Sequence, residues 1–271
     1  MKELPAAAIV SVACLFVPIQ MASQTWDDHD RSGRYVARDF GQNYLMSLQE
    51  TGNPIIYTNG DNDTFPLWYN QETEGFRTDA RTCNLSYLQT DWYIDQMKRP
   101  AYDSPSLPIT WDRMEYVEGT NEYVPVRPEY KKSIDALYAE AEKQALSGNT
   151  EALVNVKKEF GENPYELKNI LKYWIRSKNE DLKVIPTDSI VMKVDKEAVR
   201  RSGMMIPGDS IPDYMHISLK GKRALYKSEL MMLEMLANAN WERPIYMAIT
   251  VGGENHLGMG NHFTQEGLAY R

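Results

Sequence analysis

A short apolar run between turn residues begins the folded part of the chain. Residues 54–59 are rich in β-favouring side chains and are flanked by Gly and Asn, so they predict a buried strand. The stretch 64–72 then predicts a helix. Asp63 or Thr64 is suited to cap its start, and Gly75 is suited to its end.

The same strand-then-helix pattern follows directly. Residues 80–85 predict a second strand, and residues 90–97 predict a second helix that is capped by Thr90 and stops before Pro100. Alternating strands and helices form parallel sheets, and ligands usually bind where the strands of such sheets end.

The end of the chain repeats this pattern. Residues 226–239 predict a strongly apolar helix, and the nearly continuous apolar run 245–250 predicts a central parallel strand. We expect the three strands 54–59, 81–86 and 245–250 to lie side by side. The polar residues at their ends would then converge: Asn59, Asp61 and Asp63; Asn84 and Ser86; Thr250, Gly252 and Gly253.

Helices dominate the pattern between these blocks. Periodic apolar positions predict helices over 31–48, 130–146, 151–160, 165–177 and 196–201, the last one capped by Asp195. Short strands are predicted at 109–111, 123–126, 190–194 and 215–219. The predicted fold class is α/β: a small parallel, Rossmann-like sheet flanked by helices, with a helical insertion and an N-terminal apolar transmembrane helix.

This pattern divides the chain into four parts. We expect a transmembrane or signal-like helix over 1–24, the first part of the α/β domain over 25–128, a helical insertion over 129–185, and the second part of the α/β domain over 186–271. We expect the chain to be a fragment at both ends, with the second part of the α/β domain truncated.

The apolar run 4–19 contains no charged residue. One interpretation is a signal peptide with Lys2 before it, and another is the last span of a longer membrane protein, although a span needs about 20 residues. A buried core helix is the third, and it fits less well because the run is apolar on every face. The first two interpretations place the residues after Gln24 outside the cytoplasm.

Composition narrows the function classes. The chain of 271 residues has a formal net charge of −8 and an isoelectric point near 5.2, and it contains no basic stripe, so we expect no nucleic-acid partner. The two cysteines, Cys14 and Cys83, have no metal-ligand spacing and are not expected to pair.

Three interpretations of the acidic loop remain open. Asp61 and Asp63 can be structural capping residues, or they can hold Ca²⁺ or Mg²⁺ as hard oxygen ligands. In the third interpretation, the loop binds sugar hydroxyls beside aromatic rings. The candidate ligand-binding residues are Asn59, Asp61, Asn62, Asp63, Trp68, Asn84, Asp91 and Trp92.

Two further sets of residues are candidates for other roles. Asp28, His29, Arg31 and Arg34 are candidates for contact with the membrane part or with an acceptor protein, or they form a solvated collar. His256 and His262, in a glycine-rich tail, fit an exposed loop better than a metal pair.

Several motifs resemble a known family. They are 26–35 (WDDHDRSGRY), 58–69 (TNGDNDTFPLWY), 84–86 (NLS), 90–97 (TDWYIDQM), 241–246 (WERPIY) and 266–271 (EGLAYR). These motifs resemble a bacterial family of polytopic membrane proteins first catalogued as a domain of unknown function. That family is similar to an animal membrane protein O-mannosyltransferase and is grouped with GT-C-type glycosyltransferases.

The resemblance implies a location and a role. The apolar leader would be the last transmembrane span, and the rest would be an extracytoplasmic region of a cell-membrane glycosyltransferase that uses a lipid-linked sugar. Its partners would be the membrane, the upstream transmembrane bundle and exported acceptor proteins. The family's catalytic acid lies in an upstream loop, so no catalytic residue is assigned here and the isolated fragment is expected to be inactive. The alternative is a non-enzymatic secreted or membrane-anchored binding module.

Overall fold

The computed structural model describes residues 3–203, 205, 208 and 210–271, and it divides the chain into two compact units, 1–39 and 40–271. The first unit contains α1 (Glu3–His29), and α2 (Val36–Met46) begins within it. The four domain boundaries expected from the sequence stay predictions.

Helix α1 is longer than the apolar run that predicts it. The stretch Pro5–His29 has 25 residues and a mean hydropathy of 1.9, and none of its apolar window is buried. At 1.5 Å per residue it spans about 38 Å, more than the ~30 Å hydrocarbon core of a bilayer. This exposure does not fit a buried core helix and is compatible with a membrane protein. The choice between a signal peptide and a transmembrane span, and the side of the membrane, stay predictions.

The central sheet of the second unit has five strands in the order β2-β1-β7-β9-β8. These strands are β1 (Ile55–Thr58), β2 (Arg81–Asn84), β7 (Ile245–Ala248), β8 (Gln265–Glu266) and β9 (Ala269–Tyr270). β1 pairs in parallel with β2 and with β7, whereas β9 runs antiparallel to both β7 and β8. The α/β prediction and the adjacency of the three predicted strands are confirmed, and the short antiparallel edge is an addition.

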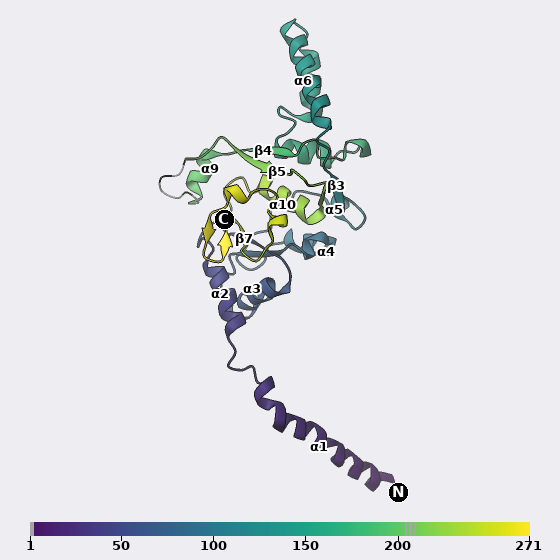
Figure 1. Cartoon of the computed structure of the whole chain (residues 1–271), viewed down its shortest axis with the longest axis vertical. Coiled ribbons are helices and arrows are strands. Elements are labelled where there is room, and N and C mark those ends of the chain that lie inside the picture. The colour runs from purple at the N-terminus through teal and green to yellow at the C-terminus, as the bar shows by residue number, and fades with distance from the viewer. Residues whose placement is uncertain (1–2, 204, 206–207, 209) are drawn as a thin grey trace. The chain divides into compact units, whose positions relative to one another are not determined.

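Helices cover both faces of this sheet. The helices next to it are α3 (Asp61–Glu74), α4 (Asp91–Met97) and α10 (Lys227–Asn238). On one face the Thr58 and Thr64 hydroxyls lie 2.7 Å apart, which joins β1 to α3. On the other face the Tyr57 hydroxyl lies 3.6 Å from the sulfur of Met235 in α10. Figure 1 shows α3 and α10 on opposite sides of β7.

A helical region and two small hairpins complete the second unit. The hairpins pair β3 (Tyr123–Pro125) with β6 (Ala224–Tyr226) and β4 (Ser189–Lys193) with β5 (Tyr214–Ser218). Among the described residues, the further α-helices are α5 (Arg113–Tyr116), α6 (Tyr130–Leu146), α7 (Glu151–Phe160), α8 (Leu167–Asn169) and α9 (Lys196–Arg201). The π-helix is η2 (Ile170–Ile175), and the short 3₁₀ helices are η1 (Tyr87–Gln89), η3 (Glu180–Leu182), η4 (Gly253–Asn255) and η5 (Gly260–His262). In Figure 1, α6 projects from the rest of this unit. Trp174 in η2 is fully buried and stacks on Phe160, with the ring centroids 5.0 Å apart.

Three local predictions are wrong. No strand forms at 109–111, because the N–H and the hydroxyl of Thr110 both donate to Glu234 in α10. The helix expected over 31–48 exists only from Val36 to Met46, because Ser32 N donates to the Asp30 carboxylate in a turn. Helix α3 begins at Asp61, so neither Asp63 nor Thr64 is its cap.

Gly41 lets α2 approach α3 closely. A Cβ atom at this position would lie 2.3 Å from the carbonyl oxygen of Pro66 and 2.5 Å from the amide nitrogen of Asn70. We therefore expect Gly41→Ala to lower the free energy of unfolding by about 2 kcal/mol, measured by urea denaturation. Gly253→Ala is the control, because nothing lies within 4 Å of its Cβ position. Equal midpoints for the two variants would contradict this close packing.

Candidate functional site

The ends of β1, β2 and β7 meet at one edge of the sheet. Thr58 pairs with Asn84 in the register of β1 and β2, and Tyr57 pairs with Met247 of β7. Parallel strands in register finish on the same edge, so the three loops that follow them are neighbours. We call these loops and the first turn of α3 the strand-end site.

Asp63 joins the loops after β1 and β7. Its carboxylate oxygen Oδ2 accepts a hydrogen bond from Asn59 N at 3.1 Å and another from the Thr250 hydroxyl at 2.7 Å. The Tyr44 hydroxyl donates in turn to the Thr250 hydroxyl at 3.3 Å. Burial raises the pKa of Tyr44, so this donor keeps its proton. Asp63 is only 3% exposed, so it holds the site together from within.

Asn84 joins the loop after β2 to the start of α3. Its amide nitrogen donates to Gly60 O at 3.2 Å and to the Thr64 hydroxyl at 2.8 Å. Its amide oxygen accepts from Ser86 N at 2.8 Å and from Tyr87 N at 3.1 Å. All four hydrogen-bonding positions of this fully buried amide are therefore used within the protein.

The exposed rim of the strand-end site is formed by Asn59, Asp61, Asn62 and Ser86. The Ser86 hydroxyl donates to the Asn59 amide oxygen at 2.8 Å, which brings the loops after β1 and β2 together at the surface. Asp61 and Asn62 occupy the first two positions of α3 and are both exposed. The rim thus offers carboxylate, amide and hydroxyl groups to solvent.

Aromatic side chains follow the rim residues along α3 and after β2. Trp68 of α3 stacks on Phe65 and on Tyr87, with ring centroids 5.7 Å and 6.1 Å apart. Trp92 of α4 is 54% exposed and lies 5.9 Å from the Tyr87 ring. Asp91 is half-buried, and its carboxylate lies 3.4 Å from a guanidinium nitrogen of Arg113. Such a wall suits the flat apolar face of a sugar ring or an apolar peptide side chain.

The structure therefore sorts the candidate residues into two groups. Asp63 and Asn84 are buried and hydrogen-bonded, whereas Asn59, Asp61, Asn62 and Trp92 are open to a ligand. Their role in binding stays a prediction, as does a Ca²⁺ or Mg²⁺ site at Asp61 and Asp63. Within the part of the chain that the structure describes, no group of three or more His, Cys, Asp or Glu side chains is arranged to hold a metal ion.

The other candidates lie elsewhere. In the first unit, Asp28 and His29 end α1, the ring nitrogen Nδ1 of His29 lies 2.9 Å from Thr25 O, and Arg31 and Arg34 bracket an exposed turn. Their contact with a membrane or a partner stays a prediction.

The two histidines of the tail each bond a backbone carbonyl. Nε2 of His256 lies 3.0 Å from Val251 O, and Nε2 of His262 lies 2.9 Å from His216 O. His256 also packs against Phe263, with the ring centroids 5.1 Å apart.

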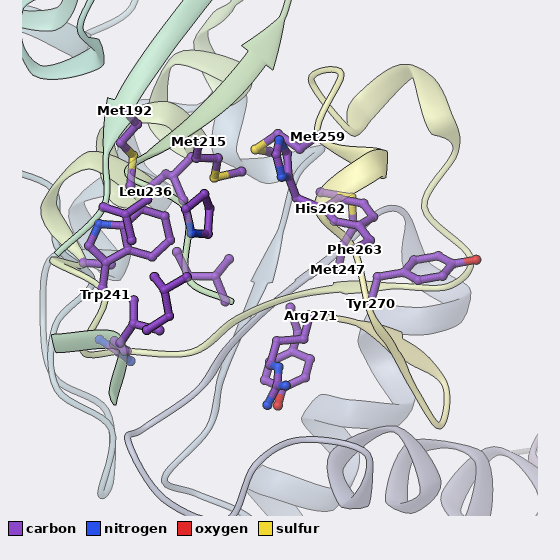
Figure 2. A pocket seen from close by; sticks show the side chains of 18 of the residues that line it. Met192, Met215, Leu236, Trp241, Met247, Met259, His262, Phe263, Tyr270 and Arg271 are labelled. Carbon is purple, nitrogen blue, oxygen red and sulfur yellow. The ribbon is translucent and has the colours of Figure 1, made fainter. Parts of the chain in front are cut away.

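The sequence did not reveal a methionine-rich pocket of about 300 Å³ (Figure 2). Met192 and Met215 from the β4–β5 hairpin line it together with Met247 of β7 and Met259. The alternating pattern of 215–219 predicts the strand that carries Met215, but it does not indicate that Met192, Met247 and Met259 lie beside it. The other lining residues are scattered along the chain.

Replacing Asp63 tests its structural role. Asp63→Ala removes the acceptor of two hydrogen bonds in a buried position, so we expect a loss of about 2 kcal/mol in the free energy of unfolding. Asp61→Ala is the matched control, and its exposed side chain should change stability by less than about 0.5 kcal/mol. Urea denaturation measures both values, and a larger loss for Asp61→Ala would show that the roles of the two acids are reversed.

A comparison with protein families identifies the family of this chain. A family model described as TMEM260-associated domain 2 matches residues 37–271, which is most of the chain. No curated protein and no solved structure matches it.

Proposed function

Because the chain belongs to the TMEM260-associated domain 2 family, we propose that it is the extracytoplasmic domain of a membrane-bound glycosyltransferase. The family relates the chain to TMEM260, and the exposed apolar helix α1 is compatible with a membrane protein. The finer parts of the proposal are the sugar-transfer chemistry, the lipid-linked donor and the side of the membrane. They rest on the resemblance of the sequence motifs described above.

The observation that carries a binding role is the convergence of three strand ends. Asp63 ties the loop after β1 to the loop after β7, and Asn84 ties the loop after β2 to α3. This buried framework fixes the exposed groups of Asn59, Asp61 and Ser86 before any ligand arrives, which lowers the entropic cost of binding.

The chemistry of the rim suits a sugar or a glycosylated acceptor. Carboxylate and amide groups exchange hydrogen bonds with sugar hydroxyls, and the neighbouring rings of Trp68 and Trp92 offer apolar surface to the face of a sugar ring. In this proposal the domain positions the sugar or the acceptor, and a catalytic acid upstream of this chain performs the transfer. The domain alone is inactive.

The test uses the full-length protein in its own membrane. Membranes that contain it are expected to incorporate labelled sugar from a lipid-linked donor into exported protein, and membranes that lack it are not. Protease added outside intact cells is expected to degrade an epitope placed after Arg271, which locates the domain. If α1 is the single transmembrane span and the membranes show no sugar transfer, the protein is instead a membrane-anchored binding module. Degradation of the epitope only after lysis would contradict the proposed location.

A further inference from the structure

A second pocket follows the outer edge of the sheet. β2 is the terminal strand in the order β2-β1-β7-β9-β8, so one of its edges faces away from β1. A pocket of about 720 Å³ lies along that edge between α3 and α4, and its lining includes Arg81 and Thr82 of β2. We call this pocket the edge groove.

The backbone of β2 offers one hydrogen-bonding position in the groove. Arg81 N donates to Pro54 O at 2.8 Å and Leu85 N donates to Thr58 O at 2.8 Å, so these residues face the β1 side. Alternate residues of a strand face the other way. Thr82 and Asn84 are the residues of β2 that face away from β1. Asn84 N already donates a hydrogen bond to the Tyr93 hydroxyl at 2.9 Å. The N–H and C=O of Thr82 therefore face the edge groove.

The groove spans both faces of the sheet. The Arg81 side chain reaches across one face to Gln96 O of α4, at 3.0 Å. The Thr82 hydroxyl donates across the other face to the Gln71 amide oxygen of α3, at 2.9 Å. An extended chain placed between them would direct successive side chains to opposite faces, as a further strand of the sheet does. A single sugar ring would use only one wall.

Arg81 gives the groove its charge preference. Arg81 is 5% exposed. Its guanidinium nitrogen Nη1 has no hydrogen-bond partner among the described residues. Burial lowers the pKa of Arg81, which reflects the cost of keeping this charge away from water. A carboxylate is the group that satisfies a buried guanidinium best, because the bond is charge-assisted. Glu72 also lines the groove, but it is exposed and accepts a hydrogen bond from the Tyr102 hydroxyl.

Part of the lining of the edge groove is aromatic. Phe65, Trp68 and Tyr87 form a continuous stack along the groove, and Trp92 stands at its end. Phe65 and Trp92 are 46% and 54% exposed, so a partner would remove a large apolar area from water.

We propose that the edge groove binds an extended acidic peptide segment as an added strand of the sheet. The backbone of the peptide pairs with Thr82, its Asp or Glu side chain pairs with Arg81, and the neighbouring apolar side chain packs on Trp68 and Tyr87. Only the assignment of this peptide to the acceptor protein rests on the proposed function. The binding itself needs neither a sugar nor a catalytic bundle.

The experiment measures peptide binding by the full chain in detergent micelles. The probe is a fluorescein-labelled, end-capped peptide, Thr-Val-Glu-Val-Thr, followed by fluorescence anisotropy. Its Gln counterpart is expected to bind about tenfold more weakly, since it lacks the charge. A probe N-methylated at both valines is also expected to bind about tenfold more weakly, since it cannot donate to a strand edge.

Protein variants locate the site. Trp92→Ala is expected to weaken binding of the Glu peptide at least about fivefold, whereas the control Tyr69→Ala, an exposed aromatic residue of α3 outside the groove, leaves it unchanged. Glu72→Gln is expected to tighten binding of the Glu peptide up to about threefold by removing a like charge. If Arg81→Met folds, it should bind the Glu and Gln peptides equally. If Arg81→Met does not fold, the difference in affinity between the Glu and Gln peptides for the unaltered chain tests the charge preference of the groove.

Equal affinity for the Glu and Gln peptides would overturn the proposal, as would binding that Trp92→Ala leaves unchanged. Displacement of the peptide by glucuronic acid would also overturn it, because the groove would then be a site for acidic sugars. These outcomes are separate from the sugar-transfer test. Loss of transfer with intact peptide binding would overturn only the proposed function.

Discussion

Glu234→Ala is expected to destabilise the second unit by about 3 kcal/mol, which is roughly a hundredfold change in the folding equilibrium. The carboxylate of Glu234 is 2% exposed at the centre of α10. Its Oε1 atom accepts from Thr110 N at 2.8 Å and from the Thr110 hydroxyl at 2.6 Å. Truncation leaves both donors without their acceptor and opens a cavity between α10 and the 105–112 segment.

Glu234→Gln is the matched control for this prediction. Its amide oxygen replaces the accepting carboxylate oxygen at nearly the same volume, so we expect less than half of the loss seen for Glu234→Ala. Urea unfolding monitored by tryptophan fluorescence measures both variants. Equal losses would show that the charge of Glu234, rather than its bonds to Thr110, stabilises the fold.

Cys83 is expected to react with a thiol reagent at least about a thousandfold more slowly in the folded chain than in urea. Its side chain is fully buried in β2, and burial raises the pKa of the thiol to about 12. Little of the thiol is therefore present as the reactive thiolate, and the reagent has little access to it. The measurement uses a Cys14→Ser background, because Cys14 is exposed in α1. Rapid modification of Cys83 under native conditions would contradict its place in the core.

The same thiol makes stability depend on pH. Its pKa is about 12 in the folded chain, against an ordinary value of 9.0. Between these two values the unfolded chain loses the proton first, so it binds fewer protons and stability falls as pH rises. A Cys83→Ala variant should lose less stability between pH 9 and pH 12 than the unaltered chain. An identical decline in both would assign the effect to the buried tyrosines instead.

The three central strands could be predicted from the sequence because each is a run of β-favouring residues between turn residues. Ile55 and Ile56 of β1 are fully buried, as such a run implies. The strands β8 and β9 could not be predicted, since each contains two residues and they pair only through the rest of the fold. The position of β2 at the edge of the sheet is a property of strand order, which the local pattern does not contain.

Within the strand-end site, the sequence indicated the right loops but not the role of each acid. The sequence does not distinguish Asp61 from Asp63, because both are aspartates of the same acidic loop. The helix begins at Asp61, and this register directs Asp63 inward to Thr250 and leaves Asp61 exposed. The methionine-rich pocket was missed for a related reason, because Met192, Met215 and Met259 are far apart in the chain.

The most direct test of the central claim changes the exposed rim and leaves the buried framework intact. The variant Asn59→Ala/Asp61→Ala/Asn62→Ala in the full-length protein is compared with Glu151→Ala on α7, which is also exposed. We predict that the free energy of unfolding of the rim variant, measured by urea denaturation, stays within about 0.5 kcal/mol of that of the unaltered protein. We also predict that its rate of sugar transfer from a lipid-linked donor falls at least about tenfold. Unchanged transfer by a folded rim variant would contradict the assignment of the strand-end site as the binding surface.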